Sequence, residues 1–137
     1  MALAYKLVHA EAPALAIWRE LGDQLKDFDI AAQGVLVATY KRPDDIKTAS
    51  GLLMPHEVVK DDEYQAKVGL VVKLGRRAFT DDEHISWYGY HCDPGDWVIF
   101  RPSDGLKMSI GGPGGVHCRL ISDTFLKVKI PHADAVF

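Results

Sequence analysis

Two His-Cys dipeptides are the first residues of this chain whose types point to chemistry. They are His91-Cys92 and His117-Cys118, and two imidazoles with two thiolates form a ligand set that zinc accepts. In a regular strand adjacent side chains point to opposite faces, so at most one residue of each dipeptide can face a common point. We therefore interpret the cysteines as buried and the histidines as surface residues, and we expect no bound metal and no cofactor.

The carboxylates were considered next as a general acid and base. They gather in three clusters, Asp44-Asp45, Asp61-Asp62-Glu63 and Asp81-Asp82-Glu83, and each cluster falls in an expected loop or helix cap. This placement is typical of solvated acidic turns. The chain also lacks the serine elbow, the H-E-x-x-H, C-x-x-C and G-x-G-x-x-G motifs, so we expect that the protein is not an enzyme.

An aromatic cluster offers a third kind of site, a platform on which nucleic-acid bases could stack. Only Arg76 and Arg77 accompany it, and a stacking platform needs more positive charge than that. Core packing or a contact between subunits is the favoured interpretation. The cluster consists of Trp87, Tyr88, Tyr90 and Trp97.

The composition predicts one domain with a real hydrophobic core. The chain has 137 residues, 47% hydrophobic and 26% charged, with a net charge of -3. This balance gives no general attraction to nucleic acid or to anionic membranes. Its apolar runs are too short to span a bilayer, and the start MALAYKLVHAEAP lacks the pattern of a secretory signal. Two cysteines make no disulfide framework, so we expect a reduced, cytoplasmic setting.

Near the N-terminus the apolar residues recur at steps of three and four. This spacing predicts a helix of about four turns over residues 13–28, with Pro13 in its first turn. We expect its apolar stripe to dock on the body of the domain, on a neighbouring subunit or on another partner. The stripe consists of Ala14, Ile17, Trp18, Leu21, Leu25 and Phe28.

From residue 34 onward the pattern changes to short strands separated by Gly, Pro and Asp turns, which predicts a mainly-β fold, a small barrel or sandwich. Val68, Leu70, Val72 and Leu74 are expected on one face of their strand. The last two strands are expected to pair through a turn at Ser122-Asp123. The predicted strands span 34–40, 66–74, 97–100, 106–110, 116–121 and 124–130.

Two connections between these strands have clear signatures. The run Gly111 to Gly115 predicts a tight turn, because no helix or Lys-Ser/Thr follows it as in a phosphate loop. Thr80-Asp81-Asp82-Glu83 matches a capping box, where a short helix could start. Residues 84–91 are expected to be irregular.

An apolar triplet, Leu52-Leu53-Met54, stands in a sequence typical of a loop. Small polar residues from Lys47 to Gly51 precede it, and Pro55 and an acidic run follow. Three bulky apolar residues without a periodic partner must be buried somewhere. Either they fold back onto this protein or they are offered to another one.

The order of these pieces from residue 34 to residue 130 resembles the GroES-type co-chaperonin family. An apolar strand ends in Lys41-Arg42, the loop with the triplet follows, and the next strand closes on Gly75. A Gly95-Asp96 pair then precedes an apolar strand, and a final pair of strands carries a short acidic turn. The match covers about 100 of the 137 residues.

The resemblance implies a small, irregular β-barrel over residues 31–137, with a mobile loop at about 44–65 and an N-terminal helical extension over 1–30. It also implies a ring, in this family of seven subunits, formed by pairing terminal strands. Gly51, Leu52, Leu53 and Met54 would dock into a groove of a GroEL-type chaperonin, which this chain would cap as a lid to assist protein folding. Weak contacts repeated around a ring would then give strong avidity.

Three departures from the family pattern stand out: the N-terminal helix, the segment 76–93 in place of a glycine-rich hairpin, and the ending 131–137. They are similar to divergent members encoded by tailed bacteriophages, which implies the host cytoplasm as location and a capsid protein as a possible folding substrate. The alternative is a virion structural protein, such as a capsid decoration or cement subunit, that reuses the fold. No nucleic-acid or membrane partner is expected.

Overall fold

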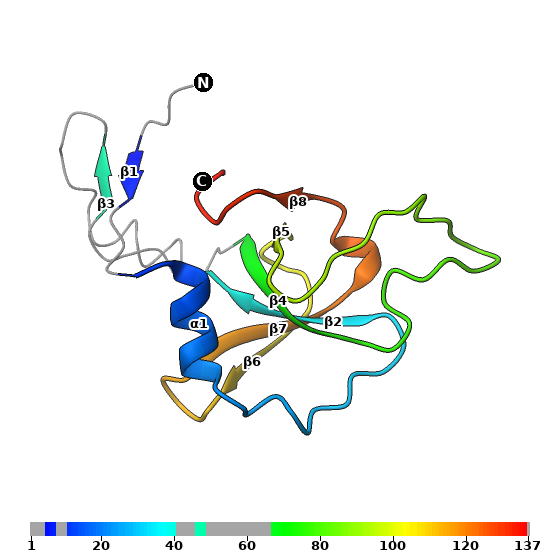
Figure 1. The fold of residues 1–137 in the computed structure, drawn as a ribbon, viewed down its shortest axis with the longest axis horizontal. Coiled ribbons are helices and arrows are strands. Elements are labelled where there is room, and N and C mark those ends of the chain that lie inside the picture. Colours follow the sequence, from blue (N-terminus) through cyan, green and yellow to red (C-terminus); the bar gives the residue numbers. More distant parts are fainter. Residues whose placement is uncertain (1–4, 8–10, 41–45, 49–66, 137) are drawn as a thin grey trace.

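A computed structural model describes the protein over residues 5–7, 11–40, 46–48 and 67–136 (Figure 1). Six strands form one antiparallel sheet in the order β6-β7-β2-β4-β5-β8. A separate two-stranded sheet pairs β1 (Tyr5–Leu7) with β3 (Ile46–Thr48). The strands of the large sheet are β2 (Gly34–Thr39), β4 (Val68–Leu74), β5 (Trp97–Ile99), β6 (Leu106–Ile110), β7 (Val116–Ser122) and β8 (Lys129–Ile130).

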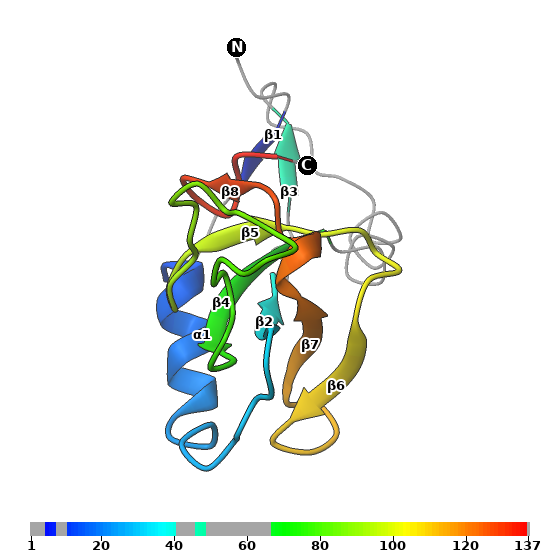
Figure 2. The same ribbon diagram turned by 90° about the vertical axis from the view of Figure 1, so that its right-hand side faces the viewer.

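This architecture confirms the expected mainly-β fold with an N-terminal helix, but the barrel is not closed. In the described part of the chain β6 and β8 are the two ends of the sheet and do not pair with each other. Closure would need a long last strand, and β8 has two residues. The sheet is instead covered on one face by α1 (Pro13–Leu21) and on the other by residues 76–92, which follow β4 (Figure 2).

β2 is a central strand of the large sheet and has no open edge. It pairs with β4 on one side and with β7 on the other. Its side chains from Val35 to Ala38 are all buried, alternately in two core clusters on opposite faces of the sheet. A continuous apolar run is the sequence of a strand buried on both faces, which explains the uninterrupted VLVA.

A β-bulge in β4 changes which face its last residues reach. Leu36 pairs with Lys73 while Val37 pairs with Val71, so Val72 is an extra residue in β4. Val72 packs in the α1-side cluster, as predicted, but Leu74 packs in the opposite cluster. The prediction that Leu74 shares the face of Val72 is therefore wrong, because strict alternation holds only up to a bulge.

The helix is shorter than the predicted span of 13–28. It ends at Leu21, because Gly22 adopts a left-handed φ of 55° and donates its N–H to the carbonyl of Trp18 at 2.9 Å. Turns follow to residue 27. Leu21 and Leu25 are nevertheless buried in the α1-side cluster, and Ile17 and Trp18 pack against it. The apolar stripe therefore docks on the body of the domain, which is one of the three expected places.

The predicted pairing of the last two strands is also wrong. β7 is followed by a 3-10 turn, η1 (Asp123–Phe125), and β8 then pairs with β5 instead of with β7. Leu126 is fully buried, whereas Val128 is 48% exposed. The chain thus crosses over the sheet after η1 instead of turning back along β7.

The predicted tight turn between β6 and β7 is confirmed. Gly115 donates its N–H to the carbonyl of Gly112 at 2.9 Å. A Cβ on Gly115 would lie 2.1 Å from the carbonyl oxygen of Ile110, so this position requires glycine. Among the described residues, no helix has the length and apolar character needed to cross a lipid bilayer.

Candidate functional site

The predicted partner-binding residues Gly51, Leu52, Leu53 and Met54 lie outside the described residues. What the structure gives is the position of the flanking elements. The strand before them, β3, belongs to the ribbon with β1, which stands beyond the large sheet (Figures 1 and 2). The strand after them, β4, enters the middle of the sheet.

The two His-Cys dipeptides do not come together. Cys92 is buried in the core cluster on one face of the sheet, and Cys118 is buried in the cluster on the other face. His91 and His117 are exposed. The prediction of buried cysteines and surface histidines is confirmed, and the sheet itself separates the two thiols. Burial raises the pKa of the Cys118 thiol to about 12 and also raises the pKa of Cys92.

The described feature that most resembles a functional site is the excursion over residues 76–92, which we call the arm. It leaves the sheet after β4 and returns to β5 without helix or strand of its own, and it extends from the body of the molecule (Figure 1). Its base is fixed by two backbone hydrogen bonds. Gly75 donates to the carbonyl of Gly34 at 2.7 Å, and Arg77 donates to the carbonyl of Ala32 at 3.0 Å.

Aromatic rings give the arm a small core. Phe79 lies edge-on to Trp87 and to Tyr90, with centroid distances of 5.1 and 5.8 Å, and Trp87 stacks on Tyr90 at 6.0 Å. Such pairs contribute about 0.5–1.5 kcal/mol each beyond burial. The backbone N–H of Phe79 donates to the buried carboxylate of Asp123 at 2.8 Å. The arm is therefore packed onto the sheet as a preformed element.

The capping box in the arm does not start a helix. Asp81 instead accepts a hydrogen bond from the N–H of Trp87 at 2.6 Å. Asp82 accepts two, from His84 at 2.7 Å and from Ile85 at 3.0 Å, and these two bonds lower the pKa of Asp82. Aspartate side chains that bond nearby N–H groups compete with helix formation, and here they fold the acidic residues into a turn.

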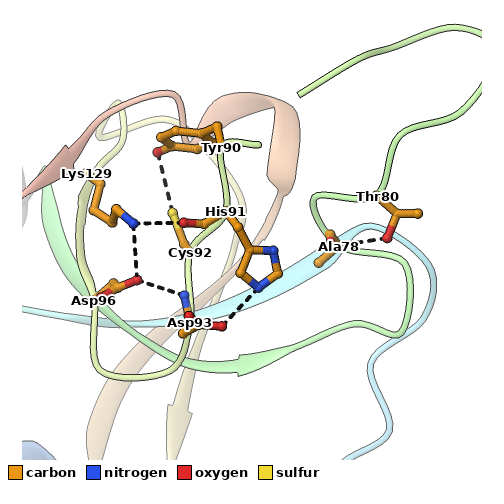
Figure 3. A network of polar contacts seen from close by, with 8 residues as sticks. All are labelled: Ala78, Thr80, Tyr90, His91, Cys92, Asp93, Asp96 and Lys129. Atoms are coloured by element: carbon orange, nitrogen blue, oxygen red, sulfur yellow. Dashed lines mark hydrogen bonds and ion pairs between the residues drawn. The ribbon is translucent and has the colours of Figure 1, made fainter. Parts of the chain in front are cut away.

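The return of the arm to β5 is held by a polar network (Figure 3). Tyr90 donates its hydroxyl to the carbonyl of Leu126 at 2.8 Å and accepts from the Cys92 thiol at 3.4 Å. Lys129 of β8 donates to the carbonyl of His91 at 2.9 Å and lies 3.8 Å from a carboxylate oxygen of Asp96. The network ties this end of the arm to the last strand of the sheet.

Tyr88 is the residue that this framework presents to solvent. It is 94% exposed between the packed rings of Trp87 and Tyr90. Its φ is 52°, in the left-handed region, and Gly89 follows at 84°. A left-handed conformation costs a residue other than glycine about 1–2 kcal/mol, and strain of this kind is concentrated at functional sites. The arm thus holds one tyrosine outward at an energetic cost.

The aromatic residues predicted from the sequence to form one cluster therefore lie on both faces of the sheet. Trp97 is buried on the α1-side face, edge-on to Tyr40 at 5.6 Å, while Trp87 and Tyr90 pack on the opposite face. Core packing is confirmed for these three rings, and a single stacking platform is excluded by the sheet between them. The outward position of Tyr88 was missed, although the Tyr88-Gly89 dipeptide is a turn signal.

No protein-family model matches this chain, and a search of curated proteins finds no significant relative.

Proposed function

We propose that the protein is a co-chaperonin lid that caps a GroEL-type chaperonin through Gly51, Leu52, Leu53 and Met54. The observation that supports this most directly is where the chain carries this segment. It runs between β3, which stands apart from the large sheet, and β4, which is anchored next to the central strand. A loop that binds a partner needs one end anchored in the body of the protein and the other end leading away from it.

The virion alternative has less support. An apolar docking face on α1 would favour this alternative, but the apolar stripe of α1 packs on the protein's own core. Leu15 is the large apolar side chain that α1 exposes, at 63%. A single exposed leucine is ordinary for a protein surface. We therefore place the lid first, and the same proposal includes a capsid protein as the folding substrate and the host cytoplasm as the location.

The proposal is tested by native mass measurement of the protein alone and with a GroEL-type chaperonin plus nucleotide. The wild type should form a capped complex. Leu53→Asp should abolish it, because a charge cannot be buried in an apolar groove without a partner. Leu15→Asp is the matched control, which places the same charge on an exposed leucine of α1 and should cap normally. Capping that survives Leu53→Asp contradicts the proposal.

A further inference from the structure

A second surface of the molecule is a groove, whereas the arm extends from the body (Figure 1). An open groove of about 660 Å³ lies between the end of β5 with the residues after it and the segment around and after η1. Phe125 and Val128 line it and are each 48% exposed. These two side chains are among the few large apolar residues that the described surface leaves open, so no described part of the chain covers this apolar surface.

The groove is positively charged. Lys67, Arg101 and Lys127 line it, and Asp104 is the acidic residue among the described residues of its lining. Both oxygens of that carboxylate are used by Arg101, which bonds it through its backbone N–H at 3.0 Å and its side chain at 2.9 and 3.1 Å. The two lysines are thus left to set the charge of the groove.

The buried guanidinium of Arg119 adds to the positive charge beside the groove. Arg119 is 3% exposed, and it donates to the carbonyl groups of Pro102 and Asp104 while its guanidinium lies 4.9 Å from the ring centre of Phe100. Carbonyl groups satisfy its N–H donors but do not cancel its charge. A ligand of this groove should therefore combine negative charge with a large apolar or aromatic group.

The arm of the same protein has this combination. Asp81, Asp82 and Glu83 are exposed near its tip, the side chain of Glu83 to 85%, and Tyr88 is 94% exposed. A tyrosine buries a large contact area at low cost in conformational entropy, because its rotamers are few. The arm is also already ordered by its hydrogen bonds and stacked rings, which lowers the entropic cost of docking.

The two surfaces belong to different parts of the molecule. In Figure 2 the arm leaves the sheet after β4 on the face opposite α1, whereas the segment that leaves β5 runs to the right. Asp82 and Tyr88 remain exposed in the monomer, so the arm does not fill its own groove. The volume of the groove, about 660 Å³, falls within the range of roughly 300–1,000 Å³ typical of binding pockets, which accommodates a tyrosine ring and its neighbours.

We propose that the arm of one copy docks into this groove of a second copy, with Tyr88 on Phe125 and Val128 and with the acidic residues facing Lys67 and Lys127. The contact joins two different surfaces, so it is head-to-tail and generates a closed ring or a filament. It would supply a contact for the ring that the family resemblance implies, but it depends only on residues of this chain and not on a chaperonin.

The test is sedimentation velocity with native mass measurement over a range of protein concentrations, using exchanges of charge. Lys127→Glu and Glu83→Lys should each weaken self-association about tenfold or more, because they place like charges opposite each other. The double variant should associate again, because both charges are exchanged. Tyr88→Ala should weaken association without changing any charge. All three residues are solvent-exposed, so these variants should fold.

Lys107→Glu on β6 is the matched control, since it makes the same charge change at an exposed position outside the groove, and it should associate as the wild type does. A wild type that stays monomeric at about 100 μM, well above the micromolar range of weak specific contacts, overturns the proposal. Loss of association in Lys127→Glu with none in Glu83→Lys and Tyr88→Ala also overturns it, because the groove would then hold something other than the arm.

The two proposals can fail separately. Leu53 is not among the residues proposed for this contact, so Leu53→Asp should associate as the wild type does. A protein that associates in this way but binds no chaperonin refutes the lid alone. A protein that caps a chaperonin while Glu83→Lys and Tyr88→Ala associate normally refutes this contact alone.

Discussion

The carboxylate of Asp123 accepts a hydrogen bond from the backbone N–H of Phe79, 44 positions earlier in the chain, at 2.8 Å. Asp123 directly follows β7 and is 1% exposed. Phe79 has a left-handed φ of 56°, and its ring packs edge-on against Trp87 and Tyr90 in the core of the arm. One buried side chain of the sheet thus fixes the base of the surface that we propose for self-association.

Asp123→Ala should lower the free energy of unfolding by about 1–3 kcal/mol, because it leaves the buried N–H of Phe79 without an acceptor. Asp123→Asn keeps an acceptor oxygen and should cost less. Urea denaturation measures both, and hydrogen exchange of the arm should accelerate more in the alanine variant. An asparagine variant as unstable as the alanine variant would contradict this role of the hydrogen bond.

Tyr88→Asn should stabilise the monomer by roughly 0.5–1 kcal/mol, because asparagine tolerates the left-handed conformation better than an aromatic residue does. The side chain of Tyr88 is 94% exposed, so little packing is lost. The same variant should weaken self-association, so the monomer would gain stability while the contact between copies is weakened. Thermal unfolding and sedimentation measure the two effects. A destabilised Tyr88→Asn variant would show that Tyr88 is not strained.

Asp104 should contribute to acid unfolding. Its hydrogen bonds and ion pair with Arg101 lower the pKa of its carboxyl below the ordinary 3.8. A carboxyl with a lowered pKa stabilises the fold above its ordinary pKa, and this stabilisation is lost as the pH falls through the folded value. Urea midpoints between pH 6 and pH 2 should therefore fall less steeply for Asp104→Asn than for the wild type. Parallel curves would count against this contribution.

Cys118 should contribute to alkaline unfolding. Burial raises the pKa of its thiol from 9.0 to about 12. The unfolded chain then loses this proton before the folded chain does, so the stabilisation is complete below pH 9 and is lost between pH 9 and 12. The free energy of unfolding should decline over this window, and Cys118→Ala should show a shallower decline from a lower starting value.

The control for that experiment is alkylation of the folded protein at pH 8. Both cysteines are buried with raised pKa values, and the thiolate is the reactive form. Iodoacetamide should therefore modify neither until the protein is unfolded in urea. Rapid labelling of the native protein would mean that the thiols are not enclosed by the two core clusters.

The strands of the large sheet could be predicted from local pattern, because apolar residues repeat or alternate between turn residues. The bulge at Val72 could not be predicted from local pattern. It depends on how β4 fits against β2, which is a property of two segments and not of either one. For the same reason the partner of β8 was missed, since the sequence of the last strand suits β7 and β5 equally well and the turn at η1 decides between them.

The predictions for the end of the helix and for a helix start in the arm were wrong for local reasons. Gly22 is a helix-ending residue, but the apolar stripe continues to Leu25, which is buried without being helical. In the arm, the aspartates that suggested a helix cap bond the backbone of a turn instead. Aspartate serves both structures, so the residues that follow decide which one forms, and in the arm those residues are aromatic.

The order of strands has a consequence for how this protein is made. β2 ends at Thr39, but its partner β7 begins at Val116, and at about 5–20 residues per second the ribosome needs roughly 4–15 s to bridge that gap. During that time the most apolar strand of the chain has one side without a neighbour. A newly synthesised chain therefore exposes an apolar edge of β2 for seconds before β7 encloses it.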